Sequence, residues 1–364
     1  MIKKTVCLNM IVKNESAVIQ RCLDSVKEII DYWVIVDTGS TDGTQAIVQD
    51  VLKGIPGELH ERLWVNFEHN RNEALALAKD HGDYFLFLDA DDRLVFRGEI
   101  KWPDLVDDYY LAAHRHGTRM DQRILLVHSQ LDWKWEGIVH EAIMCPEALH
   151  EAVLEDPYVL ATQEGFRSKN LLEKFLSDAQ ILEQAIQDDP TNKRYVFHLA
   201  GSYAAAGNLE RALKYFNQRI ALGDSTLEVF FSLYQKAVIE RELGFPTEEF
   251  IQSYIRAYLC RPTRAEPFFC LADHYMKNDC YLLGYLFSKC ALMISDTKDC
   301  FNNQFAINDY GLLYQLAECA GRIGNYQEAY EALKQLLLVE NLPSDIREAS
   351  EKNLALPLFD SYRG

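Results

Sequence analysis

Three carboxylates follow a short apolar run near residue 90. Residues 84 to 88 read YFLFL, and Asp89, Asp91 and Asp92 come almost directly after them. A short, aromatic-rich apolar run bounded by polar residues is typical of a buried strand. Two Asp residues at i and i+2 point to the same side of an extended chain, so both can approach one divalent cation and the phosphates that it carries. An ordinary acidic turn is the alternative interpretation.

Polar side chains also follow two other apolar runs. The segment 32 to 44 reads YWVIVDTGSTDGT, in which Asp37 ends the run and a small-residue turn leads into a helix. The first apolar run of the chain leads to Asn14 and Glu15. Because the carboxyl ends of parallel strands meet at one edge of an open sheet, we expect these groups to share the rim where such sheets bind ligands. Helix capping is the alternative for Asp42.

A histidine stands beside a carboxylate in the segment 133 to 141, which reads WKWEGIVHE. We expect Ile138 and Val139 to form a short strand that brings His140 and Glu141 out together. An imidazole next to a carboxylate suits metal ligation or proton transfer. We interpret His140 as a metal or diphosphate contact, and a structural histidine is the alternative.

The composition narrows the class of protein. The 364 residues are 48% apolar and 25% charged, with a formal net charge of −18. These values are typical of a globular chain of about two domains, and the negative charge argues against a nucleic-acid partner. No apolar stretch is long enough for a transmembrane segment and the first is too short for a signal peptide, so a cytoplasmic location is expected. The nine cysteines contain no CxxC pair, which favours buried thiols over zinc ligands.

The pattern of the chain changes near residue 165. Before this point strand-like and helix-like runs alternate, which predicts a Rossmann-like α/β domain with a mostly parallel sheet. After it, nearly every segment has a helical pattern. The expected divisions are an α/β domain, an all-α solenoid and a C-terminal tail, over residues 1–165, 166–345 and 346–364.

The helical half contains internal similarity. Three related segments cover residues 198–216, 270–287 and 315–333. They resemble tetratricopeptide (TPR) repeats, and a degenerate unit is expected between them around Leu233 to Pro262, with its turn at Gly244. Such repeats stack into a solenoid in which each unit packs on its neighbours.

The N-terminal motifs, taken together, resemble those of a known family. NMIVKNE begins at Asn9, VIVDTGSTDGT begins at Val34, the LDADD segment ends at Asp92 and WEGIVHE begins at Trp135. In this order and spacing, over residues 5–145, they resemble family 2 glycosyltransferases of the GT-A fold. A TPR-like half is a known companion in one branch of that family. The resemblance implies a metal-dependent, inverting transfer of a sugar from a nucleotide diphosphate, with a UDP-sugar favoured, to a peptide, protein or glycan.

The resemblance also gives roles to residues by their positions. The implied donor-binding residues, for nucleobase, ribose and diphosphate, are Ile11, Asn14, Glu15, Asp37, Arg71, Asn72 and Asp89. The implied ligands of Mn²⁺ or Mg²⁺ are Asp91 as the main ligand and Asp89, to which the argument above adds His140. Arg71 as a surface ion-pair residue is the alternative.

An inverting transfer needs a carboxylate that deprotonates the acceptor. Glu141 is our first candidate, followed by Asp132 and Glu136. The family commonly supplies an Asp from a Glu-Asp pair after the acceptor loop. The pair in this region, Glu155 and Asp156, runs directly into a proline, so we do not expect it to be equivalent.

Two basic residues, Arg167 and Lys169, lie between the predicted domains. In an acidic chain they are candidates to contact the diphosphate and offset its charge. Solvated residues before a helix are the alternative. For the whole chain, the alternative function is a catalytically silent scaffold that binds protein partners through its TPR-like repeats. A homodimer through the helical domain is a further expectation.

Overall fold

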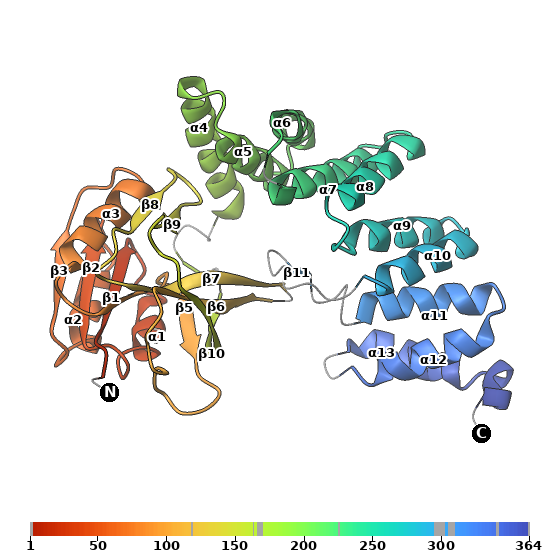
Figure 1. Ribbon diagram of the computed structural model, residues 1–364, viewed down its shortest axis with the longest axis horizontal. Helices are drawn as coiled ribbons and strands as arrows, with labels where there is room; N and C mark the ends of the chain where they lie inside the picture. The colour runs from red at the N-terminus through yellow and green to blue at the C-terminus, as the bar shows by residue number, and fades with distance from the viewer. Residues whose placement is uncertain are drawn as a thin grey trace. The chain divides into compact units, whose positions relative to one another are not determined.

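The computed structural model describes residues 3–117, 119–162, 164–165, 170–224, 226–294, 303–304, 310–339 and 342–362. The chain divides into two compact units (Figure 1). The first runs to Asp188 and also takes in Asn303, the first residue of the two-residue strand β11 (Asn303–Gln304). The first unit therefore extends beyond residue 165, because helix α4 (Leu171–Asp188) belongs to it.

The first unit is built on a sheet with the strand order β3-β2-β1-β4-β7-β6-β10-β5. Strands β3, β2, β1 and β4 run parallel, and the later strands add antiparallel pairs at β4–β7, β7–β6 and β10–β5. Strands β8 and β9 form a separate antiparallel pair. The predicted α/β fold is thus confirmed. Its elements are β1 (Val6–Val12), α1 (Ile19–Asp24), β2 (Tyr32–Asp37), α2 (Thr44–Val51), β3 (Gly57–Glu61), α3 (Phe67–Ala78), β4 (Tyr84–Phe87), β5 (Asp92–Val95), β6 (Tyr109–His116), β7 (Arg119–His128), β8 (Lys134–Glu136), β9 (Ala142–Met144) and β10 (Glu151–Ala161).

Alternation of side chains along β1 explains why helices cover both faces of the sheet. Val6 and Leu8 belong to the apolar cluster that contains residues of α1 and α2. Cys7, between them, belongs to the opposite cluster, which contains residues of α3. Asn9 also faces α3, and its Nδ2 donates a hydrogen bond of 2.8 Å to the Ala74 carbonyl. Successive residues of a strand point to opposite faces, so a strand that is apolar throughout becomes buried on both.

The described helices of the second unit follow one another in pairs. They are α5 (Lys193–Ala205) with α6 (Leu209–Leu222), α7 (Thr226–Glu242) with α8 (Thr247–Cys260), α9 (Glu266–Lys277) with α10 (Tyr281–Leu292) and α11 (Leu312–Arg322) with α12 (Tyr326–Leu337), followed by α13 (Ser344–Leu354) and the 3₁₀ helix η3 (Pro357–Tyr362). No described helix is long and apolar enough to cross a lipid bilayer.

The turns inside these pairs share one conformation. Gly207, Gly244, Asp279 and Gly324 have φ values of 74°, 75°, 59° and 84°. In each turn the following amide bonds to a carbonyl five residues back, as Asn208 does to Tyr203 at 2.9 Å. This pattern ends a helix with a left-handed residue, a conformation that glycine adopts without steric cost. The predicted TPR-like helical architecture, including the degenerate unit with Gly244 at its turn, is confirmed.

Candidate active site

Strands β2, β1 and β4 are neighbours, so the polar groups that follow them meet at one edge of the sheet. The ends of β1 and β2 are tied together: Asn14 Oδ1 accepts from the Thr41 amide, and the Asn14 amide donates to Ser40 Oγ, both at 2.8 Å. Asp37 Oδ1 accepts from the amides of Gly39 and Ser40 at 2.8 and 2.7 Å. Its Oδ2 is buried and has no hydrogen-bond partner among the described residues. A ligand N–H group would relieve the cost of that buried acceptor.

Ile11 and Glu15 occupy the same edge. Ile11 is half-buried on β1, and the Glu15 amide donates to Thr44 Oγ1 at 2.8 Å at the start of α2. A Cβ on Gly165 would lie 3.3 Å from Glu15 Oε1 and 3.1 Å from Asp91 Oδ2. The carboxylates of Glu15 and Asp91 therefore flank the Gly165 backbone.

Arg71 joins two of the candidate carboxylates. Its Nη2 donates to Asp89 Oδ1 and its Nε donates to Glu141 Oε1, both at 2.6 Å, and the guanidinium stacks over Trp135 at 4.7 Å. Burial disfavours the charge of Arg71, but the attraction of the two carboxylates outweighs it and raises the pKa of Arg71. Loss of hydration acts against the charge of Asp89 as well, yet Arg71 holds the pKa of Asp89 below its usual range. Arg71 and Asp89 are therefore both charged at neutral pH.

Asp91 is anchored through both its backbone and its side chain. Its carbonyl accepts from Thr162 Oγ1 at 2.8 Å, and its Oδ2 accepts from the Gly165 amide at 3.0 Å. Its Oδ1 makes no hydrogen bond with any residue that the structure describes. The adjacent Asp92 is only 5% exposed, and burial together with the charges of Asp89 and Asp91 raises the pKa of Asp92 to about 8. Asp92 therefore carries a proton at neutral pH, whereas Asp89 is ionised.

The predicted metal ligands do not form one three-residue cluster. Within the described residues, no group of three His, Cys, Asp or Glu side chains is arranged to hold a metal ion. The set of Asp89, Asp91 and His140 is therefore not brought together. Two carboxylates still suit a cation such as Mg²⁺, which commonly takes one or two protein carboxylates and completes its coordination with substrate phosphates and water. The donor set at Asp89 and Asp91 fits a cation that arrives with a diphosphate.

The structure corrects the expected strand at Ile138 and Val139. Strand β8 ends at Glu136, and the next five residues form the turn before β9. Gly137 and His140 have φ values of 112° and 56° in this turn. Left-handed residues on both sides of Ile138 and Val139 bend the chain instead of extending it, so apolar β-branched residues were a misleading signal here.

The three candidate bases lie in different surroundings. Asp132 is on an exposed loop, with its Oδ2 3.1 Å from Lys134 Nζ. Glu136 is exposed on β8. Glu141 has a side chain that is only 12% exposed and is bonded to Arg71, which also holds Asp89. Of the three, Glu141 is the one that the structure connects to the rim.

Other predicted residues have structural contacts or lie outside the described part. Asn72 exchanges two hydrogen bonds with the backbone of Trp135, at 2.8 and 2.9 Å, and so fastens β8 to α3. Arg167 and Lys169 lie outside the described residues.

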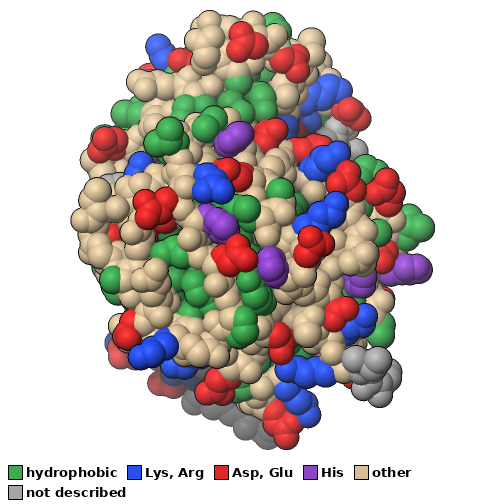
Figure 2. All heavy atoms as spheres, turned by 90° about the vertical axis from the view of Figure 1, so that its left-hand side faces the viewer, with side chains coloured by type: hydrophobic (Ala, Val, Ile, Leu, Met, Phe, Trp, Pro, Cys, Tyr) green, Lys and Arg blue, Asp and Glu red, His purple; other side chains and the backbone are tan. Residues whose placement is uncertain are grey.

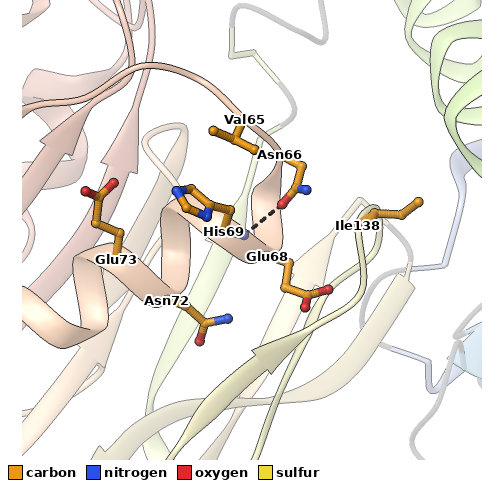
Figure 3. Close-up of a pocket in the computed structure, with 7 residues that line it drawn as sticks. All are labelled: Val65, Asn66, Glu68, His69, Asn72, Glu73 and Ile138. Atoms are coloured by element: carbon orange, nitrogen blue, oxygen red, sulfur yellow. Dashed lines mark hydrogen bonds between the residues drawn. The ribbon is translucent and has the colours of Figure 1, made fainter.

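A pocket of about 460 Å³ lies between α3 and the turn after β8. Figure 3 shows Glu68 and Asn72 on the side of α3 that faces Ile138. Glu68 Oε2 accepts from the Gly137 amide at 2.8 Å, which joins the helix to the turn. The full lining is Val65, Asn66, Glu68, His69, Asn72, Glu73 and Ile138. Of this lining, Asn72 alone was predicted as a site residue from the sequence, because the other residues form no motif.

The surface of the first unit carries charges of both signs. Figure 2 shows acidic and basic side chains interspersed with apolar ones over this face of the molecule. Three consecutive apolar residues before α3 are exposed: Leu63 by 87%, Trp64 by 42% and Val65 by 57%. Val65 links this apolar segment to the pocket, since it forms part of the pocket lining.

Residues 7–96 match the family model described as "Glycosyl transferase family 2". This stretch runs from β1 to the residue after β5 and contains Asp37, Asp89 and Asp91. The N-terminal domain is a family 2 glycosyltransferase domain. The helical unit that follows this glycosyltransferase domain has the TPR-like architecture described above.

Three relatives match parts of this chain in sequence. A "TPR repeat-containing protein" of Synechococcus elongatus is 26% identical over 256 residues, which cover 66% of this chain and 62% of that protein. An "Uncharacterized glycosyltransferase" of Rickettsia felis is 34% identical over 120 residues, or 32% of this chain and 38% of that protein. The "SPbeta prophage-derived glycosyltransferase SunS" of Bacillus subtilis is 23% identical over 230 residues, or 59% of this chain and 53% of that protein. The chain thus spans between 38% and 62% of the lengths of these relatives.

Proposed function

We propose that this protein is a metal-dependent, inverting glycosyltransferase that moves a sugar from a nucleotide diphosphate donor, with UDP favoured, to a peptide, protein or glycan. The observation that carries the proposal is the placement of Asp37 and the Asp89–Asp91 pair at the ends of β2 and β4, on either side of β1. One carboxylate has an unsatisfied buried oxygen that an N–H group of a pyrimidine base would satisfy. The other two suit a cation on the diphosphate.

The leaving diphosphate is the charge that the site must stabilise. A bound Mn²⁺ or Mg²⁺ would supply that neutralisation. Asp91 would hold it through Oδ1, and Asp89 through its side chain, which is 53% exposed. Arg71 adds guanidinium donors beside Asp89, and guanidinium–phosphate hydrogen bonds are among the stronger contacts in proteins.

Glu141 is proposed as the base. The acceptor O–H gives its proton to the Glu141 carboxylate while its oxygen bonds to the anomeric carbon. The bond from that carbon to the diphosphate oxygen breaks, and its electron pair leaves with the phosphate. Glu141 can accept the proton on Oε2 while Arg71 Nε bonds to Oε1, and the diphosphate is a direct competitor for that guanidinium. Donor binding would thereby free the base.

The acceptor is proposed to approach over the pocket beside α3. The turn that carries Glu141 also carries Ile138, which lines this pocket. Asn66 and His69 offer hydrogen-bonding groups, and the exposed Trp64 offers an aromatic ring for a sugar or an apolar side chain. An assay with peptide and glycan acceptors separates the two classes, and loss of transfer without loss of donor hydrolysis in His69→Ala would support this approach.

The donor and metal are tested by a thermal-shift and hydrolysis screen of UDP-, GDP- and dTDP-sugars with and without Mn²⁺. We expect a nucleotide-dependent shift that requires Mn²⁺ and disappears in Asp91→Asn. The matched control is Asp224→Asn, which removes an exposed carboxylate of the helical unit that pairs with Lys193 at 2.9 Å. Equal nucleotide binding without metal would contradict the role given to Asp91, and no hydrolysis with any donor would favour the silent scaffold.

A further inference from the structure

Helix α1 contacts both ends of the Asp89–Asp91 loop through two consecutive side chains. Cys22 Sγ donates to the Asp89 carbonyl at 3.4 Å. Arg21 Nη2 lies 3.5 Å from the Asp91 carbonyl, which is a weak hydrogen bond taken alone. The loop that carries the proposed cation ligands therefore rests on α1, outside the motifs that the sequence displays.

Arg21 acts on Asp91 mainly through Thr162. Arg21 Nη2 donates to Thr162 Oγ1 at 2.5 Å, and the same hydroxyl donates to the Asp91 carbonyl at 2.8 Å. A hydroxyl has one proton to give and lone pairs to accept, so both bonds form at once. Arg21 Nη1 also forms an ion pair with Glu164. One guanidinium thus holds the chain at two points just after β10.

The same stretch of chain places an amide on the Asp91 side chain. The Gly165 amide donates to Asp91 Oδ2 at 3.0 Å. A Cβ at Gly165 would lie 3.1 Å from that oxygen and 3.3 Å from Glu15 Oε1, closer than ordinary contact. A side chain at this position would therefore displace the Asp91 or Glu15 carboxylate by a few tenths of an ångström. With Oδ2 held by the amide, rotation of the carboxylate is restricted and Oδ1 is left for a ligand.

We propose that Arg21 is a positioning residue for Asp91. By holding Thr162 and Glu164, it fixes the backbone and carboxylate of Asp91 in the direction needed for the cation that accompanies the donor diphosphate. Arg21 has no contact with the ligand in this scheme. The inference rests on the proposed function, because it gives Asp91 the role of cation ligand.

The test measures metal binding rather than turnover. Mn²⁺ is titrated, with electron paramagnetic resonance as the readout, in the presence of whichever of UDP, GDP and dTDP the wild-type chain binds most tightly. Residues that orient a metal ligand typically affect metal affinity by roughly ten- to a hundredfold. We expect a loss of this size in Arg21→Ala and in Thr162→Val, because both break the relay to Asp91.

Conservative variants separate positioning from general stability. Thr162→Ser keeps the hydroxyl that accepts from Arg21 and donates to the Asp91 carbonyl. Its Mn²⁺ affinity should therefore stay within about threefold of the wild type. Arg21→Lys keeps the charge but lacks the planar fork that reaches both Thr162 and Glu164, so an intermediate loss is expected. Lys27→Ala, which removes an exposed ion pair with Asp24 just beyond α1, is the matched control and should bind as the wild type does.

The outcomes are distinct. Wild-type Mn²⁺ affinity in both Arg21→Ala and Thr162→Val overturns the inference and leaves the proposed function intact. A lower melting temperature in metal-free buffer with unchanged Mn²⁺ affinity per folded molecule also overturns it, because the role would then be structural. If the wild-type chain itself shows no metal-dependent nucleotide binding, the metal part of the proposed function fails and the inference fails with it.

Discussion

Buried arginines in the two units have different surroundings. In the helical unit Arg264 is 2% exposed, its Nε donates to Glu266 Oε2 at 3.1 Å, and its guanidinium lies 5.4 Å from the ring centre of Phe230. In the first unit the Arg71 side chain is 11% exposed, and that of its partner Asp89 is 53% exposed. The helical pair is closed on itself, while the Arg71 network opens onto the rim of the sheet.

A second helical arginine follows the same rule as Arg264. Arg219 is fully buried, donates to the Gly223 carbonyl at 2.7 Å and to Glu228 Oε2 at 2.9 Å, and so ties the end of α6 to α7. The Arg219 guanidinium is therefore engaged in contacts within the helical unit. The comparison teaches that burial of a guanidinium does not itself mark a functional site, and that Arg71 differs from Arg264 and Arg219 in the exposure of its partner Asp89.

The largest effect on stability is expected in the closed pairs. Arg264→Met should lower the free energy of unfolding of the helical unit by about 3 to 5 kcal/mol, because it leaves the Glu266 carboxylate buried without its partner. The measurement is urea unfolding followed by far-ultraviolet circular dichroism. Donor hydrolysis per folded molecule should stay at the wild-type level.

A double variant is the control for that prediction. Arg264→Met combined with Glu266→Leu removes both charges, and replacing a buried ion pair by apolar groups is often neutral or stabilising. The double variant should therefore recover most of the lost stability. The comparison with Arg71 requires the Arg264–Glu266 pair to be closed. A loss below about 1 kcal/mol in the single variant would show that it is not.

Substitution of Arg71, which bonds to Asp89 and Glu141, should instead affect activity more than stability. Arg71→Lys keeps a positive charge but cannot bond Asp89 and Glu141 in the same fork geometry. We expect kcat/KM to fall roughly ten- to a hundredfold, the value of one or two charge-assisted hydrogen bonds, with a small change in unfolding free energy. Steady-state kinetics at saturating Mn²⁺ provide the measurement.

Arg322→Lys is the matched control, since Arg322 forms an exposed ion pair with Glu318 at 3.0 Å in the helical unit. Its kinetics should not change. A variant of Arg71 that unfolds easily but keeps wild-type kcat/KM would reverse the comparison, because Arg71 would then be a structural arginine like Arg264.

The parts of the fold that could be predicted from the sequence are those with a clear local signal, such as an apolar run or a glycine at a turn. The apolar runs of β1, β2 and β4 each lead to polar residues, and their parallel pairing follows from the alternation with helices. Three of the four helix-pair turns contain glycine, at Gly207, Gly244 and Gly324, so local chemistry marked them. The fourth uses Asp279, which weakens the signal and explains why that repeat departs from the pattern.

The rest depends on contacts between distant segments. Arg71 and Glu141 are 70 residues apart, and Arg21 and Thr162 are 141 apart, so neither contact leaves a local pattern. The later strands of the sheet are only partly buried. Strand β10, which runs parallel to β6, shifts its register against β6 between Leu154 and Val159, which breaks regular alternation. Sequence therefore predicted the rim, its carboxylates and Arg71 as a site residue, but not Arg21 or the distant partners of these two arginines.

A smaller effect concerns the acid stability of the first unit. His114 on β6 is 7% exposed, and its Nδ1 has no hydrogen-bond partner among the described residues. Burial, reinforced by the charge of Arg123, lowers the pKa of His114 from 6.5 to about 4. The unfolded chain therefore takes up this proton at a higher pH than the folded chain does. The stabilisation is complete above about pH 6.5 and is lost as the pH falls through about 4.

His114→Gln removes this titration. In metal-free buffer the free energy of unfolding of wild type should fall by about 3 kcal/mol more than that of the variant between about pH 7 and about pH 4. His116→Gln, two residues along the same strand and half-buried, is the control and should keep the wild-type slope. If His114→Gln also keeps the wild-type dependence of unfolding free energy on pH, another group is responsible for the loss of stability in acid. We expect His114→Gln to reduce the dependence of unfolding free energy on pH in the first unit and to leave that of the helical unit unchanged. That result would place the acid-sensitive group in the sheet rather than in the closed ion pairs of the repeats.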